Sequence, residues 1–183
     1  MVVFTRWRPP IQAELKSTLL KGHWEQSPGK ADHYRRSIYV FARRNFRYPL
    51  FATFDRPAAN NSCAVRNKST TSLQALVLLN SHLTLDLSRQ MAGDISKNTE
   101  SDEEFIKEAI RRGFGRDPDK WLMQKTQSSL QSRRNRILED VSVGREYATP
   151  IPNPVGMNKI DASVYTDLCT AIFNTLEFMY IQQ

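Results

Sequence analysis

The sequence predicts a mainly α-helical protein with four to five helices, long ordered loops rich in aromatic residues, and little or no β-structure. Two stretches carry a Ser/Thr-x-x-Glu/Gln pattern directly before apolar residues at helical spacing, which is how many helices begin. The last twenty or so residues repeat the same apolar spacing. Apolar residues make up 40% of the 183 positions, enough for a packed core.

The first third of the chain contains one predicted helix between two irregular segments. Residues 1–31 are expected to be irregular because prolines and glycines interrupt them. Residues 32–45 favour a helix with Asp32 as N-cap, although their aromatic content would also suit a strand. Residues 46–68 read as an ordered loop anchored by aromatic side chains, with a short extended piece around Leu50–Phe54.

The strongest helix signal begins at Thr71. Thr71 as N-cap and Gln74 three residues later form a capping box. We expect this helix to run to about residue 94 with a kink near Asn80–Ser81. Its expected buried face consists of the apolar residues Leu73, Leu76, Val77, Leu79, Leu83, Leu87 and Met91.

A second capping box, Ser101 with Glu104, starts the next helix, which Gly113 or Gly115 ends. Its predicted buried stripe is Phe105, Ile106, Ala109, Ile110 and Phe114. Asp117 as cap and Pro118 in the first turn then predict a further helix. Its looser apolar face is Trp121, Leu122, Leu130, Ile137 and Leu138, and the stretch "QSRRNR" within it is strongly polar.

Residues 142–158 contain three prolines and two glycines and are expected to form a loop. A closing helix follows within 159–183, with Val164, Leu168, Ala171, Ile172 and Phe178 on one side. We therefore expect a single domain over 1–183, in which 32–141 form the main helical body. The chain contains no internal repeat and no apolar run long enough to span a membrane.

Common catalytic and cofactor motifs are missing from the sequence. No phosphate-binding glycine motif occurs, nor a G-x-S-x-G nucleophile motif. The histidines His23, His33 and His82 make no H-x-x-x-H pair, and there is no C-x-x-C-H for haem attachment. We expect no metal or cofactor in this chain and lean towards a non-enzymatic role.

Two groups of residues are candidate sites. The first 70 residues hold 13 Lys and Arg against 4 Asp and Glu, which suggests an acidic partner. The second group is a candidate polar cluster of Asp55 and Cys63 in the loop and Asn80 in the helix after it. The two cysteines, Cys63 and Cys169, are far apart in the sequence, and their spacing does not demand a disulfide. The candidate anion-binding or partner-binding residues are Arg35, Arg36, Arg43, Arg66 and Lys68.

Several of these motifs resemble a known family. Tyr34-Arg35-Arg36-Ser37, Phe54-Asp55 with Pro57, Cys63-x-x-Arg66 and the hydroxyl-rich lead into Leu73-Gln74-Ala75-Leu76 are similar to the signature of the Planctomycete Surface Domain 1 family. The stretches "AIRRGFGRDPD" (109–119) and "YTDLCTAIFNTLEFMYI" (165–181) resemble later segments of that family. The chain departs from the family pattern at Ser72 and at Gly113-Phe114.

The resemblance implies a C-terminal portion of a longer, exported or cell-surface planctomycete protein. In that family the domain typically follows a cytochrome-c-like domain, so haem is expected only in an upstream domain. We expect no signal peptide in this chain, because Arg6 and Arg8 interrupt its short apolar opening. No catalytic residues come with the resemblance, because none is established for the family.

The favoured interpretation is a non-catalytic interaction or structural module of an exported multidomain protein. It would dock on a cytochrome-like domain or on an anionic polymer of the cell surface. One alternative is part of a redox or hydrolytic enzyme that upstream domains complete, with Asp55, Cys63 and Arg66 lining a cleft. The other is nucleic-acid binding by the arginine- and aromatic-rich segment 34–48.

Overall fold

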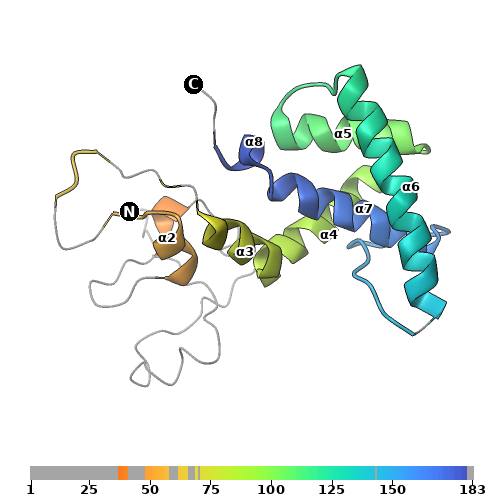
Figure 1. Cartoon of the computed structure of the whole chain (residues 1–183), viewed down its shortest axis with the longest axis horizontal. Helices are drawn as coiled ribbons and strands as arrows, with labels where there is room; N and C mark the ends of the chain where they lie inside the picture. Colours follow the sequence, from red (N-terminus) through yellow and green to blue (C-terminus); the bar gives the residue numbers. More distant parts are fainter. Residues whose placement is uncertain are drawn as a thin grey trace, which may run out of the picture. The chain divides into compact units, whose positions relative to one another are not determined.

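The fold is that of a computed structural model, which describes residues 37–40, 48–57, 62–65, 69, 71–142 and 144–180. Clustering of contacts divides the chain into two compact units, residues 1–71 and 72–183. The described residues are mainly helical and contain no β-strand, which confirms the predicted fold class. Five of the described helices have nine or more residues (Figure 1).

The described part of the first unit contains a 3₁₀ turn, η2 (Ser37–Tyr39), and a short helix, α2 (Pro49–Thr53). The turn η2 leads into an isolated bridge at Val40, so this part of the predicted 32–45 helix is not α-helical. The extended piece expected around Leu50–Phe54 is also wrong. Pro49 has its backbone angle preset for the first helical turn, and the hydroxyl of Thr53 donates a hydrogen bond of 3.1 Å to the Pro49 carbonyl oxygen.

The second unit contains the remaining helices, whose bounds follow the predicted starts and stops closely. They are α3 (Ser72–Asn80), α4 (His82–Ser96), α5 (Asp102–Phe114), α6 (Lys120–Ser142), α7 (Lys159–Phe173) and α8 (Leu176–Met179). The start expected at Thr71 is confirmed. The kink expected near Asn80–Ser81 is a complete break, because Ser81 has extended backbone angles and stands as N-cap of α4.

Local capping explains where the other helices begin and end. The Ser101 hydroxyl accepts a hydrogen bond from the backbone N–H of Glu104, as the predicted capping box requires, and Gly115 ends α5 in the left-handed conformation. The cap of α6 is Asp119 and not Asp117, because Asp119 accepts from the Leu122 N–H at 2.7 Å. Asp117 binds Arg111 at 2.9 Å instead.

The predicted closing helix is divided in two. Asn174 and Thr175 interrupt it, and the Thr175 hydroxyl accepts from the N–H of Phe178 to start α8. Both residue types bind nearby backbone groups well and therefore favour helix ends. Of the side chains expected to face inward, Val164 and Ile172 are buried, whereas Ala171 and Phe178 are exposed.

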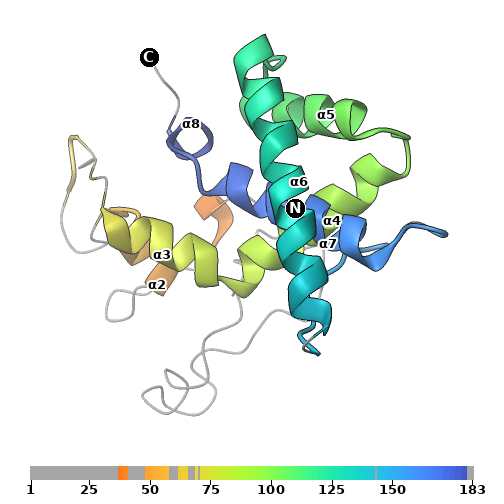
Figure 2. The ribbon, with the colours of Figure 1, turned by 45° about the vertical axis from the view of Figure 1, so that its right-hand side comes forward.

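The core of the second unit lies among α4, α5, α6 and α7. In Figures 1 and 2, α4 and α7 lie side by side, and α5 and α6 lie on the other side of α7 from α3. The predicted stripe of α5 is confirmed, since Phe105, Ile106, Ala109 and Ile110 are buried. The buried core cluster consists of Ala92, Ile95, Phe105, Ile106, Ala109, Ile110, Leu130, Ile137, Val164, Tyr165, Cys169 and Ile172.

The helices α4 and α7 pack extensively on each other, and both bury several small residues. On α4 these include Thr84, Ser88 and Ala92, and on α7 they include Ala162 and Thr166. The hydroxyl of Ser88 donates to the Thr84 carbonyl oxygen at 2.8 Å, and that of Thr166 donates to the Ala162 carbonyl oxygen at 3.1 Å. Because the hydroxyls of Ser88 and Thr166 bond within their own helices, both side chains can be buried without leaving these polar groups unpaired.

The proline-rich loop crosses α4 and is fixed to it. The backbone N–H of Ile151 donates to the Arg89 carbonyl oxygen at 2.9 Å, and the Arg89 side chain donates from Nε to the Thr149 carbonyl oxygen at 2.7 Å. Gly93 lies directly beneath this crossing. The loop expected over 142–158 is confirmed, and its middle is part of the packed structure.

Candidate interaction surface

Each member of the candidate polar cluster makes hydrogen bonds of its own. The Asp55 carboxylate, on a residue with a positive φ of 53°, accepts hydrogen bonds from the Ser69 backbone N–H at 2.8 Å and from the Ser69 hydroxyl. The exposed Cys63 thiol donates to the Val65 carbonyl oxygen at 3.0 Å. Asn80 belongs to the second unit, and its side-chain amide donates to the Leu76 carbonyl oxygen at 2.9 Å.

The bonds of Asp55 and Cys63 differ in how far they reach along the sequence. The Asp55 carboxylate bonds a residue 14 positions away in the sequence. The hydrogen bonds of Asp55 and Cys63 given above go to Ser69 and Val65 and do not join these two residues to each other. The candidate residues Arg35, Arg36, Arg43, Arg66 and Lys68 lie outside the described residues, as does most of the arginine- and aromatic-rich segment 34–48.

The helix α3 carries an exposed apolar surface that the periodicity had assigned to the core. Leu73, Leu76 and Leu79 are 55%, 55% and 58% exposed. These three residues are called the leucine face here. The one buried residue of α3 is Gln74, which is 1% exposed. The predicted burial of these leucines is therefore wrong.

The reason is the position of α3 relative to the other helices of its unit. Among the described helices, α3 packs chiefly against α4, its neighbour in sequence, and it projects away from α5 and α6 (Figure 2). Leu83, at the start of α4, is 37% exposed and extends the apolar surface across the break. No residue of α3 is charged. The result is an uncharged helix with an apolar outer side, which is typical of a contact surface.

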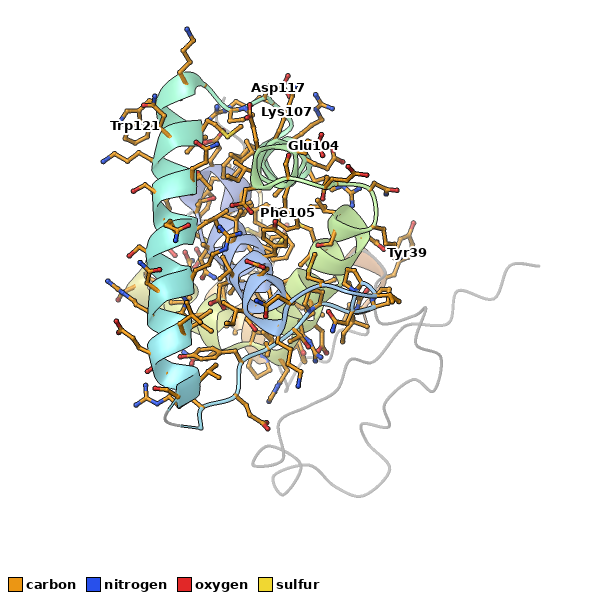
Figure 3. The ribbon with its side chains drawn as sticks, turned by 90° about the vertical axis from the view of Figure 1, so that its right-hand side faces the viewer. Tyr39, Glu104, Phe105, Lys107, Asp117 and Trp121 are labelled. Carbon is orange, nitrogen blue, oxygen red and sulfur yellow. The ribbon has the colours of Figure 1, made fainter. Side chains whose placement is uncertain are left out.

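A charged cluster that sequence reasoning missed joins three helices. The Arg134 guanidinium of α6 binds both carboxylate oxygens of Asp102 in α5 at 2.6 and 2.5 Å, and it binds Asp161 in α7 at 2.6 Å. The Tyr165 hydroxyl donates to Asp102 at 2.7 Å, and its ring stacks on Phe105. Figure 3 shows Phe105 directed into the space between the helices. Only 18% of the Arg134 side chain is exposed.

The hydrogen bonds and the burial of this cluster shift the pKa values of Asp102 and Tyr165. The hydrogen bonds from Arg134, followed by that from Tyr165, lower the pKa of Asp102, and burial opposes them. Burial and the bond to Asp102 raise the pKa of Tyr165. The signal in the sequence was the spacing of Leu130, Arg134 and Ile137, which places the arginine on the buried side of α6.

The remaining polar surface of the described residues includes two open hollows and no group of metal ligands. In that part of the chain, no three His, Cys, Asp or Glu side chains lie close enough together to hold a metal ion. Two open hollows flank α5, and Lys107 lines both; Lys107 and Asp117 point outward in Figure 3. Trp121, expected on the packed face of α6, is 65% exposed and projects away from the bundle (Figure 3). No described helix is both long and apolar enough to cross a membrane.

Comparison with known proteins shows the family of the chain. Residues 6–130 match the model of the family PSD1, described as proteins of unknown function (DUF1553). The chain therefore belongs to the PSD1 family, as the motifs at 34–80 predicted. The similar stretch at 165–181 lies beyond the matched residues. No curated protein and no solved structure matches the chain significantly.

Proposed function

We propose that this chain is a non-catalytic interaction module of a longer exported protein, and that it docks on another domain of that protein through the leucine face. The observation that carries the proposal is the exposure of Leu73, Leu76 and Leu79 on a helix without charge. Contiguous exposed apolar side chains on a soluble domain mark a surface that another molecule covers. The exported, multidomain setting is what the family resemblance implies.

The chemistry of the leucine face favours an apolar protein surface over an anionic polymer. An anionic polymer binds through Lys and Arg, and α3 has neither. Apolar side chains gain free energy by burial against other apolar groups, about 25 cal/mol per Å² removed from water. The family resemblance supplies a cytochrome-like upstream domain as the partner. The basic residues of the first unit remain a second candidate contact for an acidic surface.

The test is binding between this chain and the upstream domain of the same gene, expressed separately and measured by titration calorimetry. Replacing Leu73, Leu76 and Leu79 together by Gln is expected to weaken binding by at least tenfold, because buried anchors dominate interface energy. The helical circular dichroism should not change, since these side chains are exposed.

The matched control uses exposed apolar residues elsewhere. Leu138 and Val141 on α6 are 53% and 48% exposed, and their replacement by Gln should leave binding unchanged. Equal affinity of the leucine-face variant and the wild type would refute the proposed contact. Equal weakening by both variants would show a general loss of apolar surface instead of a specific contact.

A further inference from the structure

The helix α3 ends at a point where the backbone leaves the helical conformation completely. Ser81, between α3 and α4, has φ −78° and ψ 125°. The backbone N–H of Ser81 donates to the Leu78 carbonyl oxygen at a long distance, 3.4 Å, and the α4 hydrogen bonds resume with Leu85 to Ser81. A single non-helical residue between two helices is the kind of position that absorbs a change of angle between them.

The inner side of α3 is held from the other end of the chain. The Gln74 side-chain oxygen accepts a hydrogen bond of 2.7 Å from the hydroxyl of Tyr180, which lies 106 residues away. Gln74 is the only buried residue of α3. The leucine face points outward and the other apolar side chains of α3 are only half-buried, so a polar contact weighs more in holding α3 than it would in a core helix.

Tyr180 is itself fixed by the short segment before it. Glu177 of α8 binds Arg116, just after α5, through two hydrogen bonds of 2.7 and 3.0 Å. The ring of Phe178 packs on that of Phe173 in α7, with 4.7 Å between the ring centroids. The segment Thr175–Tyr180 is thus attached to α5 and α7, and it presents the Tyr180 hydroxyl to Gln74.

We propose that α3 is a hinged arm, with Ser81 as the hinge and the segment Thr175–Tyr180 as the latch that holds its inner side through Gln74. A nine-residue helix is too short to be stable alone, so release of the latch frees α3 to move and to unwind. Opening also exposes the half-buried Ala75, Val77 and Leu78 and enlarges the apolar surface. A role for this motion in partner binding rests on the proposed function, whereas the latch itself does not.

The test is amide hydrogen exchange of the whole chain, followed by mass spectrometry over residues 72–80. Replacing Tyr180 by Phe removes the hydroxyl and leaves a buried Gln oxygen with one partner fewer. Exchange in α3 is expected to accelerate by about tenfold, as loss of a buried hydrogen bond predicts. Exchange in α5 and α7 should stay the same.

Two further variants make the result specific. Tyr147→Phe removes another hydroxyl that is hydrogen-bonded, to Asp140, and should leave the exchange of 72–80 unchanged. Combining Tyr180→Phe with Gln74→Met should accelerate the exchange of 72–80 by less than the two single effects together, because both changes remove the same hydrogen bond. Unchanged exchange in Tyr180→Phe, or acceleration throughout the second unit, would overturn the latch.

The same Tyr180→Phe variant separates the latch from the proposed function. Faster exchange in α3 together with unchanged affinity for the upstream domain would leave the latch standing and remove its role in binding. Unchanged exchange together with lost binding of the leucine-face variant would leave the docking proposal standing and remove the latch.

Discussion

Gly93 is the residue at which one added carbon atom should do the most harm. A Cβ at this position would lie 2.7 Å from the backbone carbonyl carbon and oxygen of Ile151 and 2.7 Å from the carbonyl oxygen of Pro152. In an open helix Gly→Ala gains about 1 kcal/mol in helix propensity. Here the obstacle is backbone, so the loop must move away from α4.

We expect Gly93→Ala to lower the free energy of unfolding by about 1–3 kcal/mol, as overpacking in cores does. Urea denaturation followed by circular dichroism measures it. Ser129→Ala, at an exposed position of α6, is the control and should change stability by less than about 0.5 kcal/mol. A stabilised Gly93→Ala variant would show that the loop does not press on α4.

The two cysteines should differ sharply in reactivity. Cys63 is exposed, and Cys169 is a buried core residue with no disulfide partner. Burial raises the pKa of the Cys169 thiol to about 12, which leaves almost no thiolate at neutral pH. A thiol reagent at pH 8 is expected to modify one cysteine in the native chain and two in urea. Cys63→Ala should abolish the native reaction, and rapid native labelling of Cys169 would contradict the packing of α7.

At the scale of elements, the Arg134 cluster fixes how α5, α6 and α7 meet. Its carboxylates, Asp102 and Asp161, lie in the first turns of their helices, where the helix dipole also favours negative charge. Arg134 is mostly buried but its two carboxylate partners are about a third exposed, so water screens part of the interaction and the loss of one partner costs less than in a fully buried pair. The cluster is therefore expected to specify the helix arrangement.

The lowered pKa of Asp102 makes stability depend on pH in a defined direction. A depressed pKa in the folded state stabilises the fold above the unfolded Asp pKa of about 3.9, and this stabilisation is lost as pH falls through the folded value. Asp102→Asn should be less stable than the wild type at pH 6 and should lose less stability between pH 6 and pH 3. Asp94→Asn, which removes the exposed pair with Lys97, should follow the wild-type profile closely.

The ends of the helices could be predicted from the sequence better than their buried faces. Helix starts at Thr71 and Ser101 and the end at Gly115 were predictable, because caps depend on residues within four positions of one another. The faces of α3 were not. Leucines at helical spacing form the same sequence pattern whether they contact a core or a partner. The burial of Gln74 could not be predicted, because the hydroxyl that bonds its side chain belongs to Tyr180, 106 residues away.

At the scale of the whole molecule, residues 72–183 should fold without the first unit. All members of the buried core cluster lie between residues 92 and 172. A fragment of residues 72–183 is expected to show helical circular dichroism and a single cooperative thermal transition. A gradual, non-cooperative loss of signal would mean that the second unit needs residues 1–71 for its core. Full-length protein measured under the same conditions is the reference.

The sequence alone does not show which of the candidate side chains are exposed or which groups they bond in the folded chain. Asp55, Cys63 and Asn80 were singled out because they stand in motifs that resemble the family signature, and each bonds a different backbone or side-chain group. The residues of the leucine face were noted in the sequence, but they were predicted to be buried. Exposure is a property of the assembled helices and not of one helix.

By itself, the sequence determined the helical class, the family and most helix boundaries, because these depend on short-range capping, spacing and motif order. The tertiary structure alone decided which sides of the helices are buried. Arg134 became the link between α5, α6 and α7 because its partners, 27 and 32 positions away, converge on it. The leucines of α3 became a surface because the bundle closes around α4, α5, α6 and α7 and leaves α3 outside.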